Sequence, residues 1–393
     1  MIDYTVDIDK LDFKLRDELN TYLVELISSN GSDLHVKTGG MIRKRVKGDI
    51  VPVDNKRILN KTEGITLAKE LLRGRFVELV EKKSVDFTYK LNEDYRFRVN
   101  IFFQMEGVSA VFRTIPAKLP TFKELNLPSS IEEICKNTHR GIILVTGPTG
   151  SGKTTTLASM INYINGHRKS HIITIEDPIE YVYKDENCII NQRSIGQDAP
   201  TFASALRSAL REDPDIILLG EMRDLETIET ALHAAETGHL VLSTLHTVDA
   251  ADTISRIIGM FPGKEQNRIK TTLSSVLQGV ISQRLCKRAD GNGRCAAIEI
   301  MLTTPRIRNM ISEGRDDEIY EAVNDAAGNS GMQTFDKHIL KLYSDHIIDK
   351  DEALNKASRR NDLELKIKAV DMGNLSPKEY NIKDDIISLK DIG

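Results

Sequence analysis

The stretch that decides the fold is Gly147-Pro148-Thr149-Gly150-Ser151-Gly152-Lys153-Thr154. It fits the pattern G-x-x-x-x-G-K-[ST], follows the apolar residues 141–146 (GIILVT) and leads into residues 155–161 (TTLASMI), which predict a helix start. A glycine-rich turn between a strand and a helix directs backbone N–H groups toward phosphate oxygens, and the positive end of the helix dipole adds to the attraction. The stretch therefore predicts a P-loop.

The P-loop assigns roles to individual side chains. The Lys153 ammonium is expected to reach the β- and γ-phosphates of ATP, and the Thr154 hydroxyl to bind Mg²⁺. Residues 147–154 and Thr155 are the predicted nucleotide contacts. The alternative, a structural glycine turn, is disfavoured by the flanking strand and helix.

Length and composition limit the classes of protein. A chain of 393 residues predicts two domains, and a net charge of -4 provides no general basic surface for nucleic acid. The N-terminal residues 1–7 carry acids where an export signal carries bases, and no apolar run reaches the length of a membrane span. We expect a cytoplasmic protein that meets membranes only through partners.

The four cysteines are Cys135, Cys188, Cys286 and Cys295, and none forms a C-x-x-C pair. Scattered thiols of this kind are typical of reduced core residues. Residues 290–293 (DGNG) predict a turn, which allows a hairpin with Cys286 and Cys295 facing each other. A zinc site would need further ligands nearby.

The N-terminal part has the pattern of a small α+β domain over residues 1–115. An apolar stripe predicts a helix over residues 11–30, and a second helix is predicted over residues 63–81. Strands are predicted over residues 31–36, in a hairpin over 41–50, and over 85–89, 95–102 and 108–113, with a turn at 92–94.

Three prolines between residues 116 and 130 predict a linker with a hinge, and an ordinary loop is the alternative. Strands then alternate with helices from residue 131 to about 247, over 142–146, 154–166, 171–175, 201–211, 215–219, 225–237 and 239–244. This alternation predicts a doubly wound parallel sheet with ligands at the strand C-termini. The rest is predicted mostly helical, giving an α/β domain over residues 131–375 and a polar tail over 376–393.

Carboxylates follow two of the predicted strands. Residues 215–221 (DIILLGE) deliver Glu221 to the sheet edge that carries the P-loop, where it can polarise the attacking water or hold a Mg²⁺-bound water. Glu176 and Asp177 follow the strand over residues 172–175, and they are expected to organise Mg²⁺ and its water shell. For each acid the alternative is a solvated side chain at a strand end.

A third strand, over residues 239–246, starts and finishes with histidine. His246, at its C-terminal end, could sense the γ-phosphate through a ring N–H, and His239, at its start, is a second candidate contact. The alternative for each is a packing residue.

Four segments together resemble the type II/type IV secretion ATPase superfamily. Residues 147–154 are similar to its Walker A motif, and the Asp box, Walker B motif and His box match residues 173–183 (ITIEDPIEYVY), 206–227 (LRSALREDPDIILLGEMRDLET) and 237–247 (TGHLVLSTLHT). Within it the chain most resembles the type IV pilus retraction ATPases. Further similar segments are 31–36, 96–100, 112–116, 280–285 and 331–336, so the resemblance covers about residues 15–365.

The resemblance implies a PAS-like N-terminal domain, a RecA-like ATPase domain and a homohexamer. It also implies docking on the cytoplasmic side of the inner-membrane pilus platform, where ATP-driven rotation between domains powers pilus retraction. Arg96, Arg98 and Arg113 are then candidates to reach the triphosphate, with Arg211 a weaker one, since guanidinium groups suit phosphate contact. Solvated strand arginines are the alternative.

Two departures bear on the direction of the motor. The retraction family has an AIRNLIRE-type helix, and residues 306–313 (RIRNMISE) match it only in part. Extension and secretion relatives usually carry an additional N-terminal domain and often a four-cysteine zinc insert, neither of which is found here, and this favours retraction. A companion retraction ATPase, an extension or type II secretion motor, a nucleic-acid translocase and a nucleotide-gated scaffold are the rival hypotheses.

Overall fold

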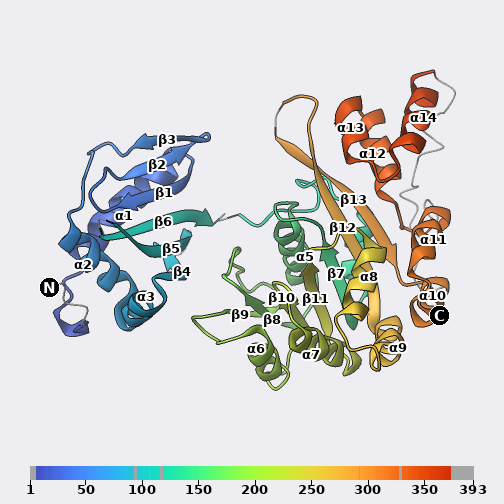
Figure 1. Cartoon of the computed structure of the whole chain (residues 1–393), viewed down its shortest axis with the longest axis horizontal. Coiled ribbons are helices and arrows are strands. Elements are labelled where there is room, and N and C mark those ends of the chain that lie inside the picture. Colours follow the sequence, from blue (N-terminus) through green and yellow to red (C-terminus); the bar gives the residue numbers. More distant parts are fainter. Residues whose placement is uncertain are drawn as a thin grey trace. The chain divides into compact units, whose positions relative to one another are not determined.

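The computed structural model describes residues 6–92, 95–105, 107–115, 118–291, 293–326 and 330–372. The polar tail predicted over residues 376–393 lies outside these ranges, as do residues 93–94 of the predicted turn and 116–117 of the predicted linker. The chain divides into two compact units (Figure 1). The first comprises residues 1–118 with 177–182 and 194–198, and the second contains the remaining residues.

The first unit is built on a six-stranded antiparallel sheet in the order β3-β2-β1-β6-β5-β4. Its strands are β1 (Gly31–Lys37), β2 (Arg43–Val46), β3 (Asp49–Pro52), β4 (Ser84–Lys90), β5 (Arg96–Gln104) and β6 (Gly107–Ile115). Its helices are the 3-10 turn η1 (Ile8–Lys10), α1 (Lys14–Ser28), α2 (Lys61–Leu72), the 3-10 turn η2 (Arg73–Arg75) and α3 (Phe76–Lys82). Every strand predicted here is confirmed.

The helices pack on the sheet through the predicted apolar stripe, in which Leu19, Leu23 and Leu26 are buried. The predicted helix over residues 63–81 is instead interrupted by η2, where Arg73 takes a positive φ of 50°. The neighbouring Gly74 weakens helical propensity at this point, which explains the break.

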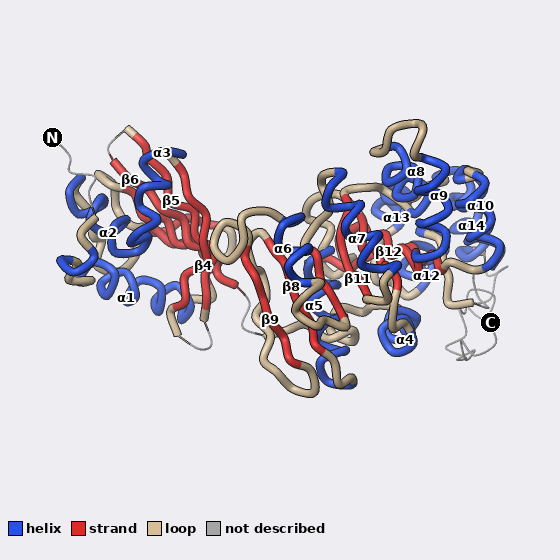
Figure 2. Tube along the Cα trace, turned by 90° about the horizontal axis from the view of Figure 1, so that it is seen from below, coloured by secondary structure: helices blue, strands red, loops and turns tan. Residues whose placement is uncertain are grey.

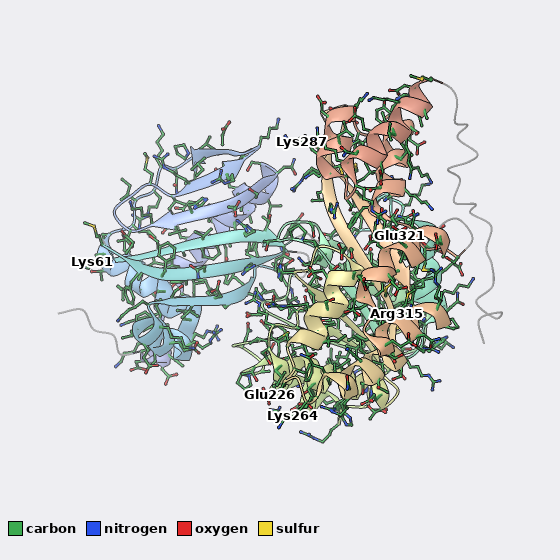
Figure 3. All side chains as sticks on the ribbon, turned by 45° about the vertical axis from the view of Figure 1, so that its right-hand side comes forward. Lys61, Glu226, Lys264, Lys287, Arg315 and Glu321 are labelled. Carbon is green, nitrogen blue, oxygen red and sulfur yellow. The ribbon has the colours of Figure 1, made fainter. Side chains whose placement is uncertain are left out.

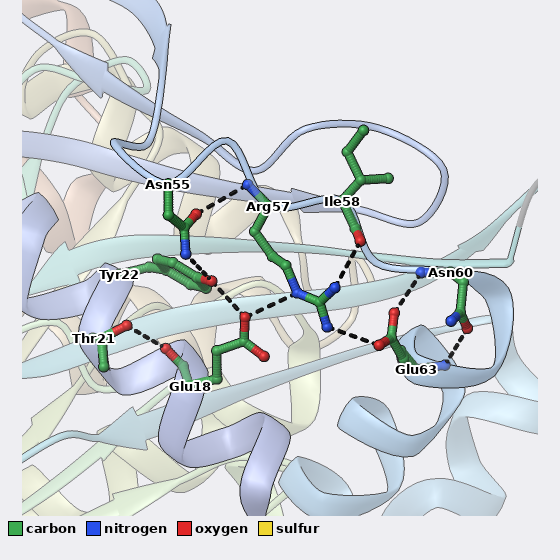
Figure 4. A network of polar contacts seen from close by, with 8 residues as sticks. All are labelled: Glu18, Thr21, Tyr22, Asn55, Arg57, Ile58, Asn60 and Glu63. Carbon is green, nitrogen blue, oxygen red and sulfur yellow. Dashed lines mark hydrogen bonds and ion pairs between the residues drawn. The ribbon is translucent and has the colours of Figure 1, made fainter.

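A polar network fixes the start of α2 against α1 (Figure 4). The Asn60 side chain caps the helix in a capping box with Glu63. Arg57 donates to Glu63 at 2.7 Å and to Glu18 of α1 at 2.9 Å. The guanidinium therefore adds a second polar link between two helices that also meet where the Arg16 N–H donates to the Glu70 carboxylate at 2.7 Å.

The second unit contains a seven-stranded sheet in the order β13-β12-β7-β11-β10-β8-β9, with helices on both faces (Figure 2). Its strands are β7 (Gly141–Thr146), β8 (His171–Glu176), β9 (Ile189–Ser194), β10 (Ile216–Leu219), β11 (Leu240–Leu245), β12 (Leu277–Lys287) and β13 (Arg294–Leu302). The strands β8, β10, β11, β7 and β12 run parallel, which confirms the predicted doubly wound sheet.

The helices of this unit alternate with the strands and then continue after them. They are α4 (Ser129–Asn137), α5 (Lys153–His167), α6 (Phe202–Ala209), α7 (Leu225–Glu236), α8 (Ala250–Gly259), α9 (Gln266–Val276), α10 (Pro305–Glu313), the 3-10 turn η3 (Asp316–Glu318), α11 (Ile319–Ala326), α12 (Phe335–Ser344), α13 (Lys350–Lys356) and α14 (Arg360–Asp371). Charged side chains such as Glu226 of α7 and Glu321 of α11 project from their outer faces (Figure 3). Among the described residues, no helix combines the length and apolarity needed to cross a membrane.

The region predicted as mostly helical also contributes the β12–β13 hairpin. Cys286 and Cys295 are paired directly across it, which confirms the predicted arrangement, and both thiols are free and buried. One arginine side chain links this hairpin to the C-terminal helices. Arg284 of β12 donates to the Lys356 carbonyl at 2.7 Å and lies 3.9 Å from the Phe335 ring centre.

Candidate active site

The P-loop joins β7 to α5 through a backbone that only glycine adopts easily. Gly147, Gly150 and Gly152 have positive φ values of 143°, 78° and 92°. At Gly147 a side chain is also excluded by space, because a Cβ atom would lie 2.4 Å from the Gln283 carbonyl oxygen. The helix α5 begins at Lys153, so the N–H groups of its first turn lie at the end of this loop.

Lys153 and Ser151 have the properties of phosphate ligands. The buried Lys153 ammonium donates to the carbonyls of Gly147 at 2.8 Å and Pro148 at 3.1 Å. Burial lowers the pKa of Lys153, while the negative charge of Glu221 opposes this shift. The Ser151 hydroxyl is buried and has no hydrogen-bond partner among the described residues. An anion in this loop would satisfy both groups.

The order of the parallel strands brings the predicted acid and imidazole to the P-loop edge. The strand β11 lies between β7 and β10, and Leu245 at its end pairs with Thr146, the last residue before the loop. The backbone beyond β10 is held against β11, since Thr244 donates its hydroxyl to the Gly220 carbonyl at 2.6 Å. Glu221 and His246 therefore emerge from adjacent strand ends.

The His246 ring connects the P-loop to Glu221. Its Nε2 lies 3.6 Å from the Glu221 Oε2, and its Nδ1 lies 3.5 Å from the Thr149 Oγ1. The same Glu221 oxygen is 2.6 Å from the Nε of Arg223, an exposed residue just after β10. The Glu221 side chain is only 15% exposed, so its charge acts in a partly desolvated environment.

Glu176 ends β8 on the far side of β10 from β11. Its carboxylate is buried and accepts from the Thr174 hydroxyl at 2.7 Å and from the Gln192 amide at 3.3 Å. Gly220 lies against it, because a Cβ there would be 3.4 Å from the Glu176 Cα. Asp177 follows directly and is exposed.

These groups fit a Mg²⁺-bound nucleotide. The turn provides N–H donors, Lys153 provides a cation, and the Thr154 hydroxyl in the first turn of α5 provides a hard oxygen ligand of the kind Mg²⁺ prefers. The Glu221 carboxylate is of the type that holds metal-bound water.

Comparison with known families decides the affiliation of the chain. The model of the type II/IV secretion system protein family matches residues 10–352. The chain belongs to this family. The resemblance found in the sequence is thereby confirmed, and with it an ATPase with an α/β fold, a PAS-like N-terminal domain and a RecA-like ATPase domain.

Several members of the type II/IV secretion system protein family are similar over most of their length. The Pseudomonas aeruginosa type IV pilus retractation ATPase PilT is 47% identical over 331 residues, which are 83% of this chain and 94% of the relative. The type IV pilus ATPase PilU of the same organism is 36% identical over 89% of this chain and 91% of the relative. A crystal structure of the pilus retraction motor PilT with bound ADP has a TM-score of 0.82 and 44% identity, covering 88% of this chain and 99% of that one.

Three predicted arginines share one face of the first unit's sheet. Arg98 on β5 pairs directly with Arg113 on β6, and Arg96 lies two residues along β5 on the same face. Arg113 is 68% exposed and donates to the buried Asp33 at 2.8 Å. Arg98 lies 3.8 Å from the Glu180 carboxylate, so each guanidinium of this directly opposed pair has an acidic partner that offsets the repulsion between them.

Two further candidates do not join the P-loop cluster. His239 lies at the N-terminal end of β11, the opposite end from His246, and its Nδ1 is 3.0 Å from the Ala234 carbonyl. Arg211 is exposed after α6 and donates to the Arg207 carbonyl at 3.0 Å. His239 lies at the start of β11, and Arg211 lies in the turn before β10. Neither residue belongs to the proposed site.

Sequence reasoning missed three polar side chains of this region. They are Arg223 on Glu221, Gln192 on Glu176, and Gln283 beneath the P-loop. Gln283 carried a signal, because three polar residues, 282–284, interrupt the apolar pattern of residues 280–285 (VISQRL). The pattern identifies an unusual strand but not the partner of its side chain.

Proposed function

We propose that the chain is a Mg²⁺-dependent ATPase motor that powers type IV pilus retraction, and thus twitching motility. The observation that carries this proposal is the convergence of Lys153, Glu221 and His246 at one sheet edge. The identity of 47% with the retraction ATPase PilT supports retraction as the work performed.

The side chains around the P-loop and after β8 then divide the chemistry. Lys153 and the N–H groups of residues 150–154 neutralise and orient the phosphates, and Thr154 holds the metal. When bound there, Mg²⁺ would offset the negative charge of the phosphates. Glu221 orients the attacking water and accepts its proton, because its carboxylate is partly desolvated and lies 3.6 Å from the His246 ring beside the P-loop. Glu176 and Asp177 organise the surrounding water, and His246 senses the γ-phosphate from its position beside Thr149.

Hydrolysis is coupled to movement in a homohexameric ring. Arg96, Arg98 and Arg113 of the N-terminal domain reach the triphosphate as that domain closes, which gives their shared face a purpose. We propose domains over residues 1–115 and 131–375 joined by a hinge over 116–130. The ring docks at the cytoplasmic face of the inner membrane on the pilus platform protein, with companion pilus ATPases as further partners and no direct role for nucleic acid.

Deletion of the gene tests the work performed. We expect the deletion strain to carry surplus surface pili and to lose retraction. The parent chain should restore retraction, and the Lys153→Ala variant should not. Pili that still retract normally in the deletion strain would refute the retraction motor, whereas loss of pili would identify an extension or type II secretion motor.

The companion role is the second candidate, since the chain is 36% identical to PilU over 89% of its length. Complementation of strains that lack one or both motors separates the two roles. A main motor restores retraction in the double deletion, but a companion restores it only when the main motor is present.

A further inference from the structure

The strand β12 places one buried amide directly beneath the P-loop. Gln283 is 2% exposed, and the preceding residue, Ser282, pairs with Thr146 at the end of β7. The Thr146 hydroxyl donates to the Ser282 hydroxyl at 2.9 Å, which holds the two strand ends together. Gln283 contacts Ser151 directly, although 132 positions separate the two residues in the sequence.

The amide nitrogen and the amide oxygen of Gln283 both make hydrogen bonds. Its Nε2 donates to the Ser151 carbonyl at 2.6 Å, and its Oε1 accepts from the Thr156 hydroxyl at 2.9 Å. A carbonyl only accepts, so the amide has a single orientation that satisfies both contacts. One side chain thus connects a peptide group of the P-loop with the first turns of α5.

The contact to Ser151 fixes the direction of a phosphate-binding group. In a planar trans peptide the C=O and the next N–H point in opposite directions. Because the Ser151 carbonyl is held toward Gln283, the N–H of Gly152 points away from β12. The loop cannot rotate this peptide without losing a buried hydrogen bond, which is costly.

Gln283 also explains two of the glycines. A Cβ on Gly147 would lie 2.4 Å from the Gln283 carbonyl oxygen, and a Cβ on Gly152 would lie 2.8 Å from its Nε2. The close approach of the β12 backbone therefore excludes a side chain at Gly147, and a Cβ at Gly152 would displace the Gln283 amide; both positions also have positive φ values.

We infer that Gln283 is a positioning residue for the nucleotide site, which holds the P-loop in its phosphate-binding form before nucleotide arrives. This inference rests on the proposed ATPase function. It assigns to β12, outside the four motifs, the task of pre-organising the loop. Pre-organisation lowers the cost of binding, so its loss raises the dissociation constant for nucleotide.

The test measures ADP binding by calorimetry and thermal unfolding of the nucleotide-free chain. Gln283→Leu keeps the volume but leaves the Ser151 carbonyl unpaired, and we expect ADP to bind about ten-fold more weakly or worse. The matched control is Gln333→Leu, since Gln333 is 1% exposed and donates to the Ile298 carbonyl at 2.8 Å. This control should lower the unfolding temperature and leave ADP affinity unchanged.

A second pair of variants keeps the test decisive if Gln283→Leu fails to fold. Thr156→Val removes the hydroxyl and should weaken ADP binding, while Thr156→Ser retains it and should restore parental affinity. The inference would be overturned if Gln283→Leu and Thr156→Val both bound ADP within two-fold of the parent affinity. It would also be overturned if Gln333→Leu weakened ADP binding about as much as Gln283→Leu does. Failure of the parent chain to bind ADP would instead overturn the proposed function.

Discussion

The Glu221 carboxylate and the His246 imidazole lie 3.6 Å apart, although they follow different strands and are 25 positions apart in the sequence. The pair exists because β10 and β11 are adjacent and parallel, which aligns their C-terminal ends. The His246 ring also lies beside Thr149, so a change at the phosphates has a direct route to Glu221.

Glu221→Gln should bind ATP and lose hydrolysis. The amide keeps the size of the side chain but cannot accept the proton of the attacking water, so we expect kcat to fall by about 10²- to 10³-fold. The measurement is phosphate release beside ATP binding by calorimetry. Glu229→Gln, on the outer face of α7, is the control and should retain full turnover. Turnover of Glu221→Gln equal to the parent would remove Glu221 from the catalytic role.

Lys153→Ala should fail at an earlier step. The variant loses a charge-assisted contact to phosphate, so the dissociation constant for ADP should rise by about ten-fold to a hundred-fold. Calorimetry at fixed Mg²⁺ measures this change, and Lys136→Ala on α4 serves as an exposed control. Unchanged affinity in Lys153→Ala would contradict the assigned phosphate site.

The sequence allowed prediction of the features that depend on local pattern. The P-loop, the parallel strands and the strand-end positions of Glu221 and His246 follow from short motifs and apolar runs. The strand β9 was missed because four of the six residues 189–194 (IINQRS) are polar and the strand lies at the sheet edge, where apolar alternation is weak. Gln283 was missed for another reason: its contacts depend on the order of strands in the sheet, which no local pattern contains.

Arg57→Ala should destabilise the first unit modestly. It removes the link from Glu18 to Glu63, and partly exposed ion pairs contribute up to about 1 kcal/mol each, so we expect the free energy of unfolding to fall by about 1 kcal/mol. Thermal unfolding of parent and variant checks this value. Lys14→Ala removes an exposed ion pair with Asp12 and should have a smaller effect. An equal loss in both variants would show that the Arg57 network adds nothing beyond surface charge.

The four thiols should be unreactive in the native chain. Burial raises the pKa of Cys135 and Cys286 to about 12 and also raises those of Cys188 and Cys295, so little thiolate is present at neutral pH. A chromogenic disulfide reagent at pH 8 should therefore label the folded chain slowly, and all four thiols should react after denaturation. Rapid labelling of any thiol in the folded chain would contradict their burial.

Glu299 should make the stability of the second unit depend on pH. Its buried carboxyl accepts from the Ala250 N–H at 3.0 Å. Burial raises its pKa from 4.5 to about 7; the Ala250 N–H and Arg284 oppose the shift, while Asp249 and Asp336 add to it. The folded chain therefore keeps a proton that the unfolded chain loses above pH 4.5. Stability from this group is complete below pH 4.5 and is lost as the pH rises through 7.

Glu299→Gln separates this effect from the rest of the chain. The glutamine cannot ionise and retains an acceptor for Ala250, so the stability of the variant relative to the parent should rise with pH. The shift of about 2.5 units corresponds to about 3 kcal/mol between pH 4.5 and 7. Denaturant unfolding at pH 5 and pH 8 measures the difference. A difference that is the same at both values would show that Glu299 is ionised in the folded chain throughout this range.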